Sequence, residues 1–155
     1  MKPILILLIS GLTIAQAYAQ QLKESEVPAA IKPAFIQKFP NAKTVTWEKE
    51  DTSSFEASFK VGKEKYSALF DTTGKWLETE TEISKDKLPE AVRAALAKEF
   101  PGYKIEETVK VETPEQELQY EVEMEKKEIS YDVRFSAGGQ ILKKEEIKES
   151  DEEKD

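Results

Sequence analysis

Alternating apolar and polar residues and glycine turns predict eight β-strands in this chain. Every second side chain from Phe55 to Val61 is apolar, and this period of two is typical of a strand with one buried face. The same alternation marks residues 44–50, 65–71, 105–111, 118–125 and 129–135, and residues 75–82 and 140–147 are assigned as strands because each follows a glycine turn. Short turns that contain glycine join some of these segments, so we expect neighbouring strands to run antiparallel.

Two other segments have the period of an α-helix. Their apolar stripes are Ile31, Ala34, Phe35 and Phe39 in the first and Val92, Ala95, Leu96 and Phe100 in the second. Pro28 and Pro89 fit first-turn positions. A further proline ends each helix, at Pro40 and at Pro101. Pro33 should kink the first helix or loosen its first turn.

The second half of the chain repeats the first. Pro28 and Pro89 lie 61 positions apart, and Phe70 and Phe135 lie 65 positions apart. One small insertion, which we place in the loop at residues 113–117, explains the change of offset. Such self-similarity indicates duplication of one supersecondary unit.

These patterns predict an α+β fold, a tandem repeat of a helix plus four antiparallel strands, with units at residues 27–83 and 84–147. The alternation leaves one sheet face apolar, so both helices should pack on that face. We favour one continuous eight-strand sheet, and two loosely joined halves are the alternative. The first strands of the two units do not align in phase, which a bulge or a one-residue shift would explain.

Residues 1–19 have the features of a signal peptide. Lys2 precedes an apolar run at residues 4–14, and Ala17 and Ala19 have the small-x-small spacing that signal peptidase cuts. The run is shorter than the ~18–20 residues that span a bilayer. We therefore expect cleavage, no membrane insertion afterwards, and a periplasmic or secreted protein.

Composition narrows the possible chemistry. The formal net charge is −8, and the chain has no histidine and no cysteine. Nucleic acids bind basic patches, so we expect no nucleic-acid partner. The chain also lacks the usual general base, thiol nucleophiles, the cysteine and histidine ligands of zinc, and the side chain that ordinarily titrates near neutral pH. We expect neither an enzyme nor a cofactor, and we assign residues 20–26 as a polar leader and residues 148–155 as an acidic disordered tail.

Several segments together resemble one known family. They are the helix starts Val27-Pro28-Ala29-Ala30 and Leu88-Pro89-Glu90-Ala91, the helix ends Phe39-Pro40-Asn41-Ala42-Lys43 and Phe100-Pro101-Gly102-Tyr103-Lys104, the triplet Val45-Thr46-Trp47, and two strand segments, Tyr66-Ser67-Ala68-Leu69-Phe70-Asp71 before Gly74 and Tyr131-Asp132-Val133-Arg134-Phe135 before Gly139. This order, present twice, resembles the PepSY-like, beta-lactamase-inhibitor-like domain of small exported bacterial proteins that are common in Bacteroidota. The resemblance covers roughly residues 27–147.

The resemblance implies an α+β fold related to beta-lactamase inhibitor protein, and a periplasmic location in a Gram-negative cell. It does not imply inhibition of a lactamase, because the family label records a likeness of fold. The family offers no functional motif that maps onto residues of this chain.

Carboxylates are the abundant reactive groups. Glu121, Glu123 and Glu125 lie at a spacing of two on one strand face, where they could bind a hard cation or a basic partner. The simpler interpretation is a solvated strand face whose charge is balanced by three lysines. These are Lys60, Lys126 and Lys127.

Apolar residues on the solvent side give the candidate binding surface. By parity, this side of the sheet carries Leu69, Leu77, Leu142 and Arg134. Apolar side chains on a flat sheet rimmed by charge suit a protein-binding surface. Scattered surface leucines are also ordinary, so this pattern alone does not define a site.

The function hypothesis is a non-catalytic exported binding module that presents an open sheet face to a protein or peptide. Inhibition or modulation of an exported enzyme is one form of that role. The alternative is a periplasmic sensor of a small ligand or a divalent cation such as calcium. An envelope stress or scaffold protein without a dedicated ligand is a third hypothesis.

Overall fold

The computed structural model describes residues 21–115 and 117–147. Within them lie two α-helices, α1 (Ile31–Lys38) and α2 (Glu90–Glu99), and two short 3-10 helices, η1 (Glu24–Glu26) and η2 (Lys85–Lys87). The strands are β1 (Gln21–Leu22), β2 (Lys43–Lys49), β3 (Ser54–Val61), β4 (Glu64–Asp71), β5 (Trp76–Glu82), β6 (Lys104–Glu112), β7 (Leu118–Lys126), β8 (Ile129–Ser136) and β9 (Ile141–Ile147). In the described part of the chain, no helix has the length and apolar character needed to cross a membrane.

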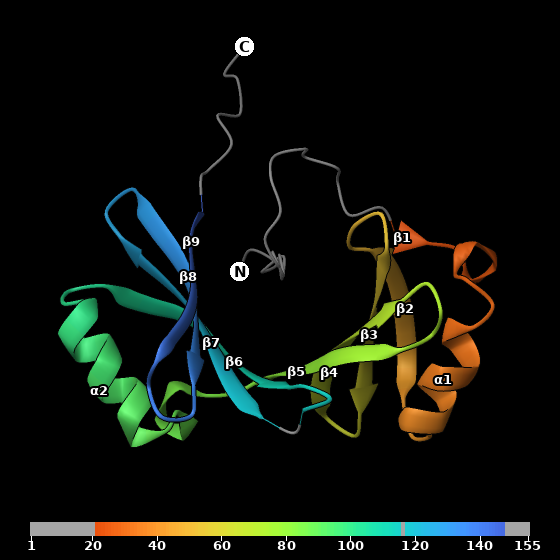
Figure 1. Ribbon diagram of the computed structural model, residues 1–155, viewed down its shortest axis with the longest axis horizontal. Coiled ribbons are helices and arrows are strands. Elements are labelled where there is room, and N and C mark those ends of the chain that lie inside the picture. The colour runs from red at the N-terminus through yellow and green to blue at the C-terminus, as the bar shows by residue number, and fades with distance from the viewer. Residues whose placement is uncertain (1–20, 116, 148–155) are drawn as a thin grey trace, which may run out of the picture.

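The strands form one antiparallel sheet whose spatial order follows the sequence, from β1 at one edge to β9 at the other. The sheet bends into a U, and the two helices lie on its outer, convex side, one on each arm (Figure 1). We call the arm with α1 and β1–β5 the first arm, and the arm with α2 and β6–β9 the second arm. Among the described residues, no helix covers the inner, concave face.

Each arm has its own hydrophobic core between helix and sheet. In the first arm the Phe35 ring of α1 makes edge contacts with Trp47 and Phe59, at centroid distances of 5.2 and 5.1 Å. The second core contains Leu88, Val92, Leu96, Phe100, Tyr120, Val122, Met124, Val133 and Phe135. Burying one large apolar side chain stabilises a fold by about 1.5–3 kcal/mol, so each arm is stabilised mainly by its own core.

The sequence predicted eight strands to within one residue at either end, but the predicted number of strands is wrong. The ninth strand is β1, whose Gln21 and Leu22 pair with Glu48 and Trp47 of β2. Two residues are too few to show alternation, so this part of the predicted polar leader carried no strand signal. Leu22 packs against the first core, and this contact explains why the strand forms.

The first helix begins later than predicted. Pro28 lies before α1, and its carbonyl accepts a hydrogen bond from the N–H of Ile31 at 3.0 Å. Pro33 is the reason, because proline has no N–H to donate inside a helix. With the helix beginning at Ile31, Pro33 falls in the first turn, where backbone N–H groups have no partner within the helix.

The predicted irregularity in the first strands is confirmed in both. The pairing of β2 with β3 shifts between Lys43 and Thr46, and that of β6 with β7 shifts between Ile105 and Glu107. Ile105, Val109 and Val111 share one parity in the sequence, but the second shift places Ile105 on a different face of the sheet from the two valines. Ile105 packs in the core beside α2, whereas Val109 and Val111 lie on the concave face.

Two glycines bring turns against the helix starts. Gly74 (φ +84°) and Gly139 (φ +82°) adopt the left-handed conformation that favours glycine. A Cβ atom on Gly74 would lie 2.5 Å from the carbonyl oxygen of Ala30, and one on Gly139 would lie 2.4 Å from that of Ala91. Both positions therefore require glycine for its conformation and for its small size.

A charge cluster as the candidate functional site

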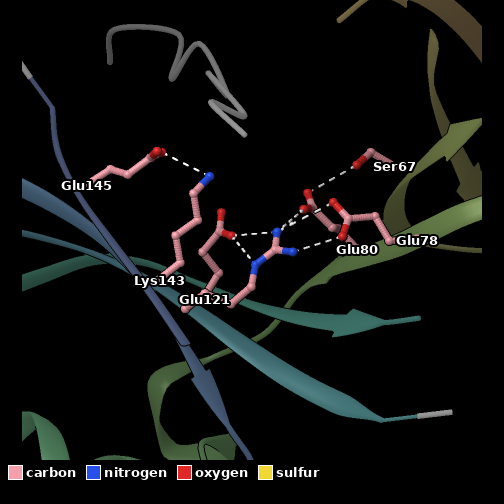
Figure 2. Close-up of polar contacts among 7 residues, drawn as sticks. Ser67, Glu78, Glu80, Glu121, Lys143 and Glu145 are labelled. Atoms are coloured by element: carbon pink, nitrogen blue, oxygen red, sulfur yellow. Dashed lines mark hydrogen bonds and ion pairs between the residues drawn. The ribbon is translucent and has the colours of Figure 1, made fainter. Parts of the chain in front are cut away.

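The concave face carries a cluster of charged side chains around Arg134. Strand register places them, because residues directly opposite one another in a sheet share a face. Arg134 of β8 lies opposite Glu121 of β7, and Glu80 of β5 lies opposite Ser67 of β4. The Glu78, Glu80 and Glu121 side chains converge in Figure 2, and each of them contacts the Arg134 guanidinium.

Arg134 binds three glutamates at once. Its Nη2 lies 2.7 Å from Glu121 Oε2, and its Nε donates to the same oxygen at 2.9 Å. Its Nη1 donates to Glu78 Oε2 at 2.9 Å, and Nη2 lies 3.4 Å from Glu80 Oε1. Ser67 Oγ donates to the other oxygen of Glu80 at 3.4 Å. The guanidinium is a planar fork of donors, a geometry that lets one side chain bind several carboxylates.

This contact crosses the sheet. Arg134 lies on β8, whereas Glu78 and Glu80 lie on β5, so the side chain reaches past β7 and β6. Val109 and Val111 of β6 lie on the same face between the partners, and both are buried. Only 16% of the Arg134 side chain is exposed, so the cluster is shielded from water much more than a surface ion pair.

The cluster contains more acid than base, and this excess raises several pKa values. Burial, with repulsion from Glu121 and Glu78, raises the pKa of Glu80 to about 9. Burial and the neighbouring Glu121 raise the pKa of Asp132 to about 8. Burial lowers the pKa of Arg134, but attraction to Glu121 and Glu78 outweighs it, and the net direction is upward. The guanidinium therefore stays charged, while part of the acid holds protons.

These carboxyls correct an inference from composition. The absence of histidine indicated that no side chain would titrate near neutral pH. Burial, with repulsion from Glu50, raises the pKa of Glu56 to about 7, and Asp132 and Glu80 follow at about 8 and about 9. The pKa values of Glu56 and Asp132 thus fall within or at the edge of the range that histidine usually covers, and the pKa of Glu80 lies above it.

Replacing Glu80 with glutamine should stabilise the fold at alkaline pH. Because the pKa of Glu80 is raised on folding from 4.5 to about 9, the folded protein binds this proton more tightly. The stability that this proton contributes to the fold is therefore fully present below pH 4.5, and it is lost as the pH rises toward 9. Glutamine mimics the protonated acid, so Glu80→Gln should exceed the wild type by roughly 2–4 kcal/mol at pH 9 and equal it near pH 4.

Urea unfolding of both proteins from pH 4 to pH 9 measures this difference. Glu82→Gln is the matched control, because Glu82 is an exposed residue of the same strand, and its curve should follow that of the wild type. Parallel pH curves for Glu80→Gln and wild type would show that Glu80 binds its proton no more tightly in the folded state.

The four residues of the predicted binding face have different environments. Leu69 is half-buried on the concave face, opposite Glu56 and Glu78. Leu77 and Leu142 lie where the register shifts, so simple alternation does not assign them to a face. Leu142 is 46% exposed, whereas Leu77 is half-buried. Arg134 uses its donors on the glutamates described above.

The acidic strand face is not the solvated surface that the sequence suggested at Glu121. The Glu121 side chain is only 13% exposed, and its partner is Arg134. Lys126, one of the lysines expected to balance this face, instead donates to the carbonyl oxygen of Pro101 at 2.8 Å. Among the described residues, no three acidic, histidine or cysteine side chains are arranged to hold a metal ion.

Sequence reasoning named Arg134 but missed its partners Glu78 and Glu80. They lie 56 and 54 positions away, beyond any local pattern. A compositional signal was present, because Arg134 is one of two arginines in a chain that otherwise uses lysine. Arginine at a position that alternation places on a sheet face indicates carboxylate binding by its fork of donors.

Together these features define an α+β protein with two helices on the convex side of a curved antiparallel sheet and a charge cluster on the concave side. Residues 14–64 and 53–143 match the model of the family described as "Putative beta-lactamase-inhibitor-like, PepSY-like". The chain belongs to this family, as its motifs indicated. The search among curated proteins found no match.

Solved structures from Bacteroides share the fold. A BLIP-like protein from Bacteroides fragilis is 27% identical, with a TM-score of 0.65 over 81% of this chain and 89% of that chain. A DUF2874 family protein from Bacteroides uniformis is 25% identical, with a TM-score of 0.69 over 77% and 88%. A periplasmic protein from Bacteroides eggerthii is 22% identical, with a TM-score of 0.70 over 78% and 89%, a likeness of fold alone.

Proposed function

We propose that this protein is a non-catalytic exported binding module that receives a protein or peptide on the concave face of its sheet. The observation that carries the proposal is the one-sided packing, in which both helices lie on the convex face and leave the concave face open (Figure 1). Membership of a beta-lactamase-inhibitor-like family supports a binding role rather than a catalytic one. Inhibition or modulation of an exported enzyme is the particular form that the family description suggests.

The proposal also covers where the protein is located and how its two arms are related. We propose a periplasmic or secreted protein on the basis of residues 1–19, which lie outside the described residues together with the tail at 148–155. The similar protein from Bacteroides eggerthii, which is called periplasmic, is consistent with this location. We also propose that the arms are two copies of one unit, because Gly74 and Gly139 contact the helix starts in the same way.

Binding requires accessible apolar area beside the charges. Leu69 and Leu142 supply it, one within the concave face and the other at the exposed edge strand β9. Leu77 and Leu142 occupy equivalent positions in β5 and β9. Leu77 precedes Glu78, which lies opposite Leu69, and Leu142 precedes Lys143, which lies opposite Arg134. In the proposal, Arg134 organises the glutamates that a partner meets, while the leucines provide the contact.

Aspartate at Leu69 and Leu142 should weaken binding at least tenfold without unfolding the protein. A charge buried against a partner without a counter-charge costs more than the ~1.4 kcal/mol that corresponds to a factor of ten. Crosslinking capture from periplasmic extract, with the tagged protein as bait, identifies the partner, and titration with that purified partner measures the loss. Ile36→Asp is the control, because Ile36 is 64% exposed on α1, away from the concave face. Equal affinity of the leucine variant and the wild type would refute this assignment of the binding face.

A further inference from the structure

The two arms are joined by a short stretch of sheet. Residues Thr79–Glu82 of β5 pair with Val109–Glu112 of β6, whereas β3 pairs with β4 along its full length. Neither hydrophobic core extends across this junction, since one cluster contains residues up to Trp76 and the other begins at Ile83. The angle between the arms therefore depends on a short ladder and on side chains that cross it.

Arg134 crosses the junction. It belongs to the second arm, and it binds Glu78 at 2.9 Å and Glu80 at 3.4 Å in the first arm. Its contact with Glu121 of its own arm holds the guanidinium in position. Because β5 and β8 are separated by two strands, this contact requires the strong bend that the sheet has at β5–β7 (Figure 1). We call Arg134, Glu78, Glu80 and Glu121 the clasp.

We propose that the clasp sets the angle between the two arms, and that it opens at alkaline pH. The inference concerns the shape of the protein alone and does not depend on whether the concave face binds a partner. Opening would widen the concave face without unfolding either arm, because each helix keeps its own core.

The balance of charge around the clasp gives the direction of the change. The charged groups that the strand register places on this face with Arg134 are Lys43 and Glu48 of β2, Glu56 and Lys60 of β3, Lys65 and Asp71 of β4, Glu78, Glu80 and Glu82 of β5, Lys104 and Glu107 of β6, Glu121, Glu123 and Glu125 of β7, Asp132 of β8, and Lys143 and Glu145 of β9. Lys143 pairs with Glu145 at 3.2 Å and so adds little to Arg134. A rise in pH therefore adds negative charge around one guanidinium.

Added negative charge favours the open form. The Glu78, Glu80 and Glu121 side chains are 10–14% exposed, so each further ionised carboxyl nearby is poorly hydrated. Separation of the arms returns these groups to water and relieves their repulsion. Asp132 contributes to the same effect, because its buried Oδ1 has no hydrogen-bond partner in the structure.

Distances between spin labels test the proposal. The hairpin loops between β2 and β3 and between β7 and β8 lie at the tips of the two arms (Figure 1), so opening moves them apart. Cysteines at Thr52 and Glu128, both exposed, place one label in each loop, and the natural chain has no other cysteine to label. Double electron–electron resonance then gives the distance distribution, and circular dichroism reports whether the fold is intact.

We expect a short, narrow distribution at pH 6 and a longer, broader one at pH 9.5, with unchanged circular dichroism. Glu80→Gln should keep the short distance at both pH values, because glutamine retains a hydrogen bond to Arg134 and cannot ionise. Arg134→Met should give the long distance already at pH 6, and Lys143→Met should behave as the wild type. The proposal is overturned if the folded wild type and Arg134→Met share one distribution at pH 6, or if the pH leaves the wild-type distance unchanged.

Discussion

Replacing Arg134 with methionine is expected to reduce the free energy of unfolding by about 3 kcal/mol near pH 7. Removal of one partner from a buried ion pair costs about 3–5 kcal/mol, because the other charges stay buried without compensation. Here the groups that lose their cation are Glu78 and Glu121, each within 2.9 Å of the guanidinium, whereas Glu80, 3.4 Å away, holds its proton at this pH. We expect the lower end of the range, since opening of the arms would return these acids to water.

The loss should depend on pH. At low pH, protonation of buried acids removes negative charge that the guanidinium would otherwise compensate, so its absence matters less and the variant should approach the wild type. Urea unfolding at pH 4 and pH 7 measures both values. Lys143→Met is the matched control, because Lys143 lies opposite Arg134 but is 43% exposed, and an exposed pair contributes less than about 1 kcal/mol. Equal losses in the two variants would mean that the clasp does not stabilise the fold.

Replacing Gly139 with alanine is the second substitution with a large expected effect. An L-residue in the left-handed region costs about 1–2 kcal/mol, and overpacking adds about 1–3 kcal/mol. The overpacking arises because the new Cβ would lie 2.4 Å from the backbone oxygen of Ala91, which cannot move without α2. We expect a loss of about 2–5 kcal/mol for Gly139→Ala, and a similar loss for Gly74→Ala at the start of α1.

Gly62 separates the two contributions. Its φ is +64°, close to that of the other two, but a Cβ atom there would meet nothing within 4 Å. Gly62→Ala should therefore lose only the conformational term of about 1–2 kcal/mol. Thermal and urea unfolding of the three variants would measure the difference. If Gly62→Ala were as unstable as Gly139→Ala, close packing of the turn against the helix would not explain why position 139 requires glycine.

Most strands were predictable because they bury one face. A period of two runs through β3, β4, β7 and β8, and in β2 and β6 bulges at Thr44 and near Glu106 interrupt it near one strand end. In the sequences of β5 and β9 apolar and polar residues do not alternate, so the glycine turns before these strands indicated them. The two residues of β1 are too short for any period. The start of α1 was misplaced because Pro28 and Pro33 both suit a first turn, and the chain permits only one of them to occupy it.

The site was less predictable than the fold. Alternation placed Arg134 and Glu121 on one side of the sheet, but it gave no measure of how strongly the sheet bends. The bend brings Glu78 and Glu80 to Arg134 across two strands, and it buries a group that a flat sheet would expose. Raised carboxyl pKa values follow from that burial, so composition alone could not reveal them.

Site-specific photocrosslinking tests the proposed function most directly. A photoreactive phenylalanine derivative is placed at Leu69, at Leu142 or at Ile36 in the full chain, and cells that export the protein are irradiated. The account predicts one partner adduct from Leu69 on the concave face and from Leu142 at the sheet edge, and none from Ile36 on α1. An adduct from Ile36, with none from Leu69 or Leu142, would contradict the account and place the binding surface on the helical side.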